Sequence, residues 1–116
     1  MLLFLCLGTS VLAQSVQETL AYIEDNANKR IAKSAKNVLR YEFILQEDQL
    51  LQIVHHKKGQ SIPYAYDLNQ RIHVQFLGGE TRLFDVMIGE DRFGCEFVRK
   101  KVAEQIAFYL RQFRDQ

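Results

Sequence analysis

Two segments with a helical spacing of apolar residues enclose a middle region in which apolar and polar residues alternate, and this change of period most constrains the fold. A helix repeats about every 3.6 residues and a strand every two, so no segment satisfies both patterns at once. The chain has 116 residues, the size of one ordinary domain. The sequence therefore predicts a single α+β domain, with a helix at each end of an antiparallel sheet.

The two helices are expected to run from Ser15 to about Ala35 and from near Cys95 towards the C-terminus. Ser15 and Glu18 have the spacing of a capping box, in which two side chains satisfy the free amide groups at a helix start. In each segment the apolar residues recur at intervals of three or four and form one stripe. These residues are Val16, Leu20, Ile23, Ala27 and Ile31 in the first helix, and Val98, Val102, Ile106, Tyr109, Leu110 and Phe113 in the second.

The middle region predicts four or five antiparallel strands, arranged as a sheet or a partial barrel. Pro63 lacks an amide donor, so its strand belongs at a sheet edge. Gly78-Gly79 predicts a tight hairpin turn, because glycine adopts the positive backbone angles that such turns need. The C-terminal helix is expected to cover the sheet or to plug the barrel. Alternation marks strands over residues 38–45, 50–56, 62–66, 72–76 and 81–88.

The first thirteen residues have the order of an export signal. They carry no charge, begin with a run of apolar side chains and end in Val11-Leu12-Ala13. The run is shorter than the roughly 18 to 20 apolar residues of a membrane span. We therefore expect a signal peptide over 1–13, cleavage near Ala13, a domain over 14–116, and export to the periplasm or the extracellular space. A buried N-terminal strand is the alternative, and because no basic residue precedes the run, a true start upstream of Met1 also stays open.

Three segments together resemble small exported bacterial proteins with a pleckstrin-homology-like plan. They are SVQETLAYIEDNANK after the leader, IPYAYDLNQRIHVQF in the middle, and FVRKKVAEQIAFYLRQF at the C-terminus. The resemblance implies a sheet or barrel closed by a terminal helix. It also implies a binding or scaffold role, because such barrels generally host ligands rather than catalysis. No basic phosphoinositide motif of that superfold matches this sequence.

The charge balance and the missing motifs exclude several functional classes. Fifteen Lys and Arg residues against 14 Asp and Glu residues give a net charge of +1, so no overall field would attract nucleic acid. The sequence contains no phosphate-binding loop, dinucleotide fingerprint, HExxH motif or EF-hand. We therefore expect no cofactor, no nucleic-acid partner and no transmembrane span.

The candidate binding residues are two tyrosines and two histidines. Tyr64 and Tyr66 stand two apart on the proline-marked strand, so they share a face and form an aromatic platform, unless they pack against their own sheet. His55 and His56 are adjacent and point to opposite faces, so at most one of them pairs with His73. A transition metal needs further ligands with defined spacing, and we predict no metal site.

Cys95 is the candidate reactive thiol. At the first turn of a helix the dipole would lower its pKa and favour the thiolate. A buried, inert cysteine is the favoured interpretation, because no feature ties a histidine to it. The leading hypothesis is thus an exported, non-enzymatic binding or interaction module for an unknown protein, peptide or small ligand. A small cysteine hydrolase that uses Cys95 with a histidine is the alternative, and a homodimer through a free edge strand is a third.

Overall fold

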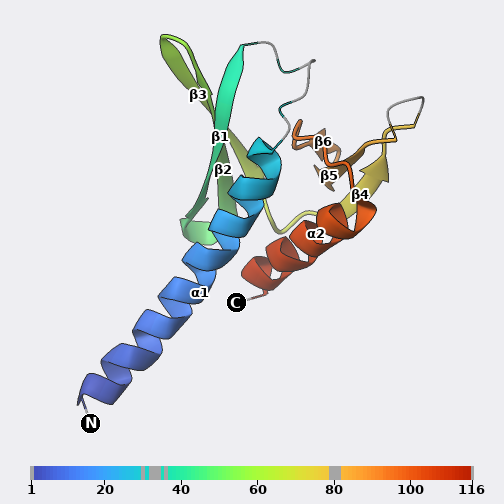
Figure 1. The fold of residues 1–116 in the computed structure, drawn as a ribbon. Helices are drawn as coiled ribbons and strands as arrows, with labels where there is room; N and C mark the ends of the chain where they lie inside the picture. The colour runs from blue at the N-terminus through green and yellow to red at the C-terminus, as the bar shows by residue number, and fades with distance from the viewer. Residues whose placement is uncertain (1, 30, 32–34, 36, 79–81, 116) are drawn as a thin grey trace.

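The computed structural model describes residues 2–29, 31, 35, 37–78 and 82–115 and confirms the α+β class. Two long helices enclose the strands in the chain, one near each end (Figure 1). The elements are α1 (Leu2–Asn28), β1 (Val38–Gln46), a short helical turn η1 (Glu47–Gln49), β2 (Leu50–Lys57), β3 (Gln60–Asp67), β4 (Ile72–Phe76), β5 (Phe84–Ile88), β6 (Asp91–Arg92) and α2 (Lys100–Arg114).

The strands form two antiparallel sheets of three strands each. Sheet A has the order β1-β2-β3 and sheet B the order β4-β5-β6. The sequence predicted four or five strands in one sheet, and the added strand, β6, is only two residues long. A strand of two residues is too short to show alternation, so the sequence did not reveal it. The chain divides into two sheets because β3 and β4 do not pair with each other. The predicted turn at Gly78-Gly79 lies partly outside the described residues.

Both helices differ from their predicted bounds. Within the described chain, α1 already begins at Leu2, so Ser15 lies inside it, and the carbonyl of Ser15 accepts a hydrogen bond from Thr19 Oγ1 at 2.8 Å. The Ser15–Glu18 capping box is therefore not a helix start, and α1 ends at Asn28 instead of near Ala35. Cleavage near Ala13 stays a prediction. Among the described residues, no helix combines the length and the hydropathy of a membrane span.

The C-terminal end of α1 covers one edge of sheet A. The Asn28 amide accepts a hydrogen bond from Tyr41 N–H at 2.7 Å and donates one to Tyr41 C=O at 2.9 Å. One turn earlier, Glu24 Oε2 accepts a hydrogen bond from Phe43 N–H at 3.2 Å. These side chains therefore satisfy backbone groups of β1 that a further strand would otherwise bond.

The opposite edge of sheet A is β3, which confirms the edge position predicted for Pro63. A two-residue turn, Lys58-Gly59, joins β2 to β3, with Lys57 opposite Gln60. Counting from that turn, Pro63 is in a pair whose backbone groups point away from β2. The missing amide of Pro63 therefore faces the open edge and interrupts it.

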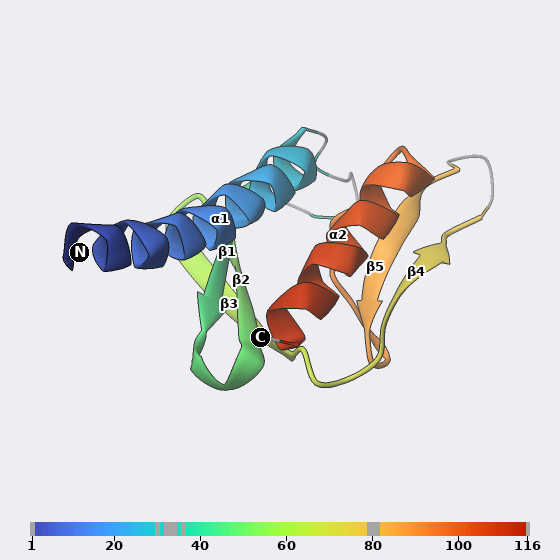
Figure 2. The same cartoon turned by 90° about the horizontal axis from the view of Figure 1, so that it is seen from below.

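One hydrophobic core joins both sheets and both helices. Figure 2 shows α1 running beside sheet A, and α2 lying across β4 and β5. Phe93, which follows β6, links the sheets because its ring lies 5.7 Å from those of Phe43 and Tyr66. Tyr22 and Tyr109 join the helices through an edge-on ring contact. Other buried core residues are Leu20, Ile23, Ala27, Tyr41, Leu51, Ile53, Val86, Ile88, Ile106 and Leu110.

Candidate functional site

The two predicted platform tyrosines are in different surroundings. Tyr64 is 42% exposed, and its ring contacts that of His55 at a tilt, with 4.5 Å between centroids. Tyr66 packs on Phe93 and donates its hydroxyl hydrogen to Arg92 C=O at 3.2 Å. Burial is the main cause that raises the pKa of Tyr66 to about 12. Tyr66 is therefore largely a packing residue, and Tyr64 is the one that presents its ring to solvent.

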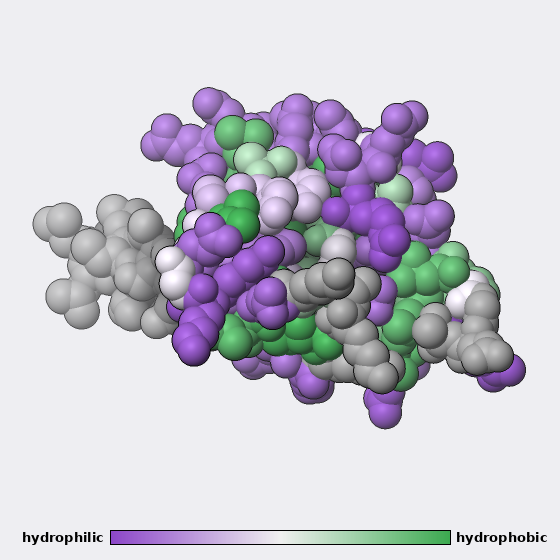
Figure 3. All heavy atoms as spheres, turned by 90° about the horizontal axis from the view of Figure 1, so that it is seen from above, coloured by the Kyte–Doolittle hydropathy of each residue, from purple (hydrophilic) through white to green (hydrophobic). Residues whose placement is uncertain are grey.

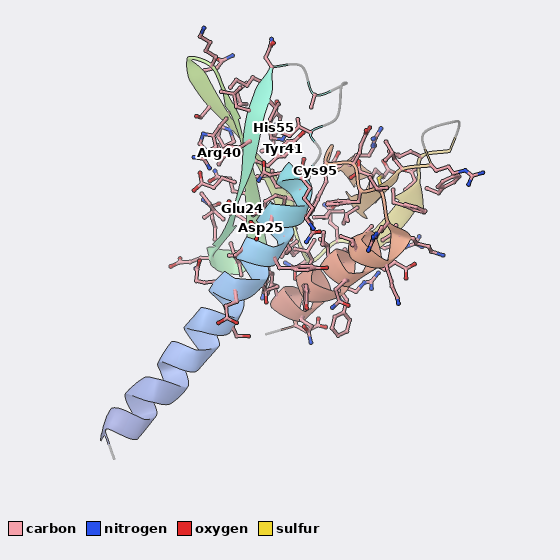
Figure 4. The ribbon with its side chains drawn as sticks, viewed as in Figure 1. Glu24, Asp25, Arg40, Tyr41, His55 and Cys95 are labelled. Atoms are coloured by element: carbon pink, nitrogen blue, oxygen red, sulfur yellow. The ribbon has the colours of Figure 1, made fainter. Side chains whose placement is uncertain are left out.

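His55 lies between two aromatic rings, whereas His73 lies in the other sheet. The His55 ring meets Tyr41 edge-on at 4.9 Å, and Figure 4 shows both side chains on sheet A beside the end of α1. Neither His55 Nε2 nor the buried hydroxyl of Tyr41 has a hydrogen-bond partner among the described residues. His73 is on β4, opposite Met87. No set of three His, Cys, Asp or Glu side chains in the described part of the chain is suited to hold a metal ion.

The position of His55 predicts a loss of stability in mild acid. Burial, together with the Lys57 charge, lowers the pKa of His55 from its ordinary value of 6.5. The fold therefore binds this proton less readily than the unfolded chain, so stability is complete above about pH 6.5 and falls as the pH decreases below it. Thermal unfolding measured between about pH 7.5 and pH 5 should show a smaller drop in Tm for His55→Phe than for the unchanged protein. An equal drop in Tm with decreasing pH in the two proteins would show that His55 is not the group responsible.

Cys95 is not at the start of the final helix, because α2 begins at Lys100. The side chain is 1% exposed and belongs to the core. Burial, with a smaller contribution from the charge of Asp85, raises the pKa of the Cys95 thiol well above its usual range. The helix dipole predicted to activate the thiol is therefore absent at this position. The geometry favours the inert interpretation of Cys95.

Asp85 is a buried carboxylate whose hydrogen-bond partners the sequence did not predict. It accepts hydrogen bonds from Val86 N–H at 2.8 Å, Gly94 N–H at 3.2 Å and Arg92 Nε at 2.9 Å. Burial raises the pKa of Asp85, while Arg92 and the two amides oppose that rise. Asp85 thus ties the segment after β6 to β5. An acidic residue within the apolar strand sequence FDVMI was the available signal.

A pocket of about 290 Å³ lies where α1 ends and the chain enters α2. Its apolar wall comes from Phe97, Val98 and Val102, and Phe97 is fixed by two backbone hydrogen bonds with Phe84, of 2.7 and 2.8 Å. Asn26 and Lys29 on α1, with Glu96 and Arg99, supply its polar groups. The sequence did not predict this site, because residues about 70 positions apart form it.

The polar rim of the pocket has an excess of positive charge. The Lys29 ammonium contacts Asn26 Oδ1 at 3.5 Å, and the Arg99 guanidinium forms no hydrogen bond or ion pair with the described residues. Glu96 lies 3.9 Å from Arg92, which offsets part of its charge. The first turn of α2 carries no acidic residue. The rim therefore favours a negatively charged group.

No family model, curated protein or solved structure matches this chain. The pleckstrin-homology-like resemblance stays a prediction.

Proposed function

We propose that this chain is a binding module that holds a small amphipathic anion, without changing it chemically, in the pocket between α1 and α2. The observation that carries the proposal is the pairing of two cationic side chains, Lys29 and Arg99, with one apolar wall. A pocket of about 290 Å³ is near the lower limit for small-molecule sites, so it fits a short carboxylate rather than a large cofactor.

Each part of such a ligand has a matching part of the pocket. A carboxylate head would bond to Lys29 and Arg99, which are exposed and retain unused donors. An alkyl or aryl tail would lie on Val98, which is 57% exposed and so leaves apolar surface to be covered. The Asn26 amide at the rim offers a further donor. A neutral or cationic ligand of the same shape would leave the two cations without a partner.

Titration with hexanoate tests the proposal, with hexanol and hexylamine as ligands of the same tail and a different charge. We expect hexanoate to bind with a Kd on the order of a millimolar and the other two to bind at least tenfold more weakly. The Lys29→Gln and Arg99→Gln variants should each lower the hexanoate affinity about fivefold, since a partly exposed ion pair contributes up to about 1 kcal/mol. NMR shift changes or calorimetry would measure this.

Lys58→Gln is the matched control, because Lys58 is an exposed lysine of the β2–β3 turn and lies outside this pocket. It should leave the affinity for hexanoate unchanged. Equal binding of hexanoate and hexanol, or equal losses in Lys29→Gln and Lys58→Gln, would overturn the proposal.

A peptide or protein partner at the β3 edge is the second candidate function, favoured by the exposure of Tyr64 on an unpaired strand. Pro63 weakens it, because an added strand would lack one amide donor in the middle of the edge. A homodimer formed by pairing two β3 strands would lack the amide donor of Pro63 in both copies. The uncharged apolar leader supports placing the binding module outside the cytoplasm in either case.

A further inference from the structure

Three polar side chains form a row across the outer face of sheet A, one from each strand. Glu42 is on β1, His56 on β2 and Ser61 on β3, with His56 directly opposite Ser61 in the register. Because side chains alternate along a strand, these three point away from the face that carries Tyr41 and His55. The row therefore lies outside the core, on the opposite face of the sheet.

The three side chains are joined by two short hydrogen bonds. His56 Nδ1 lies 2.8 Å from Ser61 Oγ, and His56 Nε2 lies 2.7 Å from Glu42 Oε1. With a neutral imidazole beside an ionised carboxylate, Nε2–H donates to Glu42 and leaves Nδ1 free to accept the Ser61 hydroxyl hydrogen. A carboxylate that orients an imidazole, which in turn accepts a hydroxyl proton, is the arrangement that activates a serine as a nucleophile.

We propose that Ser61 is a base-activated nucleophile that takes an acyl group from small activated esters. Ser61 Oγ attacks the ester carbonyl carbon and forms the new O–C bond, while its proton passes to His56 Nδ1. The bond from that carbon to the leaving-group oxygen then breaks, and His56 returns the proton to the departing oxygen. Glu42 is a positioning residue that holds the ring and stabilises the transient imidazolium.

The openness of this face defines the substrate class. Ser61 is exposed, and the His56 and Glu42 side chains are 23% and 38% exposed. Because the reacting groups are exposed rather than enclosed, reactivity depends on a good leaving group. Arg40, which shares this face and stands opposite His56 in the register, adds a cation that favours the negative charge developing on the ester oxygen. Small phenyl esters therefore fit best.

Treatment of the full chain with p-nitrophenyl acetate tests the proposal, with the acetylated residue found by peptide mass mapping. We expect Ser61 to be acetylated in the unchanged protein. In His56→Gln the acetylation rate at Ser61 should be about a hundredfold lower, since a positioned base accelerates such a reaction by a factor of about 10² to 10⁴. Glu42→Gln should lower the rate by at least a comparable factor, because the glutamine amide can donate to Nε2 and so place the ring proton on Nδ1, which then cannot accept the Ser61 proton.

Ser15→Ala is the control for an exposed serine elsewhere, and it should leave the acetylation of Ser61 unchanged. Circular dichroism of each variant separates a chemical effect from unfolding, and Glu42→Gln provides a second measurement if His56→Gln does not fold. The proposal is overturned if lysines are acetylated while Ser61 is not. The proposal is also overturned if Ser61 is acetylated in folded His56→Gln or folded Glu42→Gln at the same rate as in the unchanged protein.

Discussion

Replacing Asp85 by alanine should lower the free energy of unfolding by about 3 kcal/mol, because one buried and one part-buried amide lose their acceptor at a cost of about 1–3 kcal/mol each. Those amides belong to Val86 and Gly94, and the carboxylate that joins them is fully buried. The segment after β6 carries Phe93 and part of the apolar wall of the pocket between α1 and α2, so its attachment to β5 supports both the core and that pocket. Urea unfolding of the two proteins measures the difference.

Arg92→Gln is the matched variant for the other side of this contact. The Arg92 side chain is 47% exposed, so its removal leaves no unpaired group in the core except the carboxylate itself. We expect a smaller loss, about 2 kcal/mol, because Asp85 keeps both amide bonds. A larger loss in Arg92→Gln than in Asp85→Ala would show that the cation, rather than the backbone contacts, holds this segment.

The raised pKa of Asp85 gives this prediction a second readout. For an acid whose pKa is higher in the fold than in the unfolded chain, its contribution to stability is greatest below the unfolded value of 3.8 and falls as the pH rises towards the folded value. The Asp85→Asn variant lacks this titration. The difference in the free energy of unfolding between the unchanged protein and Asp85→Asn should therefore become smaller as the pH rises from about 4.

The elements with a strong local pattern were predictable from the sequence. Alternation located β1 to β5 to within a few residues, and Pro63 correctly indicated an edge strand. The division into two sheets was not predictable, because it depends on which strands pair after Asp67, and pairing leaves no local signal. The end of α1 was also missed. The apolar stripe continues to Ile31, whereas α1 ends at Asn28, the residue whose side-chain amide bonds to β1.

The candidate sites were harder to predict than the strands. The sequence indicates only that His56 points to the face opposite His55, and its relation to Ser61 and Glu42 appears once the register of three strands is known. The pocket between α1 and α2 joins Lys29 to Arg99 across most of the chain. Cys95 is the reverse case, a residue predicted to lie in the first turn of the final helix. Because α2 begins at Lys100, the helix dipole that made the thiol a candidate does not act on it. Contacts between distant segments, rather than residue types, determine these sites.

Replacing Asn28 by alanine should be about as destabilising as Asp85→Ala, with a loss of about 3 kcal/mol in the free energy of unfolding. The change removes the acceptor of Tyr41 N–H and the donor to Tyr41 C=O, and an alanine offers neither group. It also opens an edge of sheet A that α1 covers. We therefore expect concentration-dependent association, which light scattering would detect, in addition to the lower midpoint in urea.

Asn26→Ala is the control on the same helix turn, because the Asn26 amide donates only to Tyr22 C=O within α1 and accepts a contact from Lys29. It should cost less than about 1 kcal/mol and cause no association, since β1 stays covered. If both variants lose the same stability, the Asn28 amide contributes as an ordinary helix residue. If Asn28→Ala unfolds earlier but stays monomeric, Glu24 and its bond to Phe43 N–H suffice to protect the edge, and Glu24→Ala combined with Asn28→Ala should then produce the association.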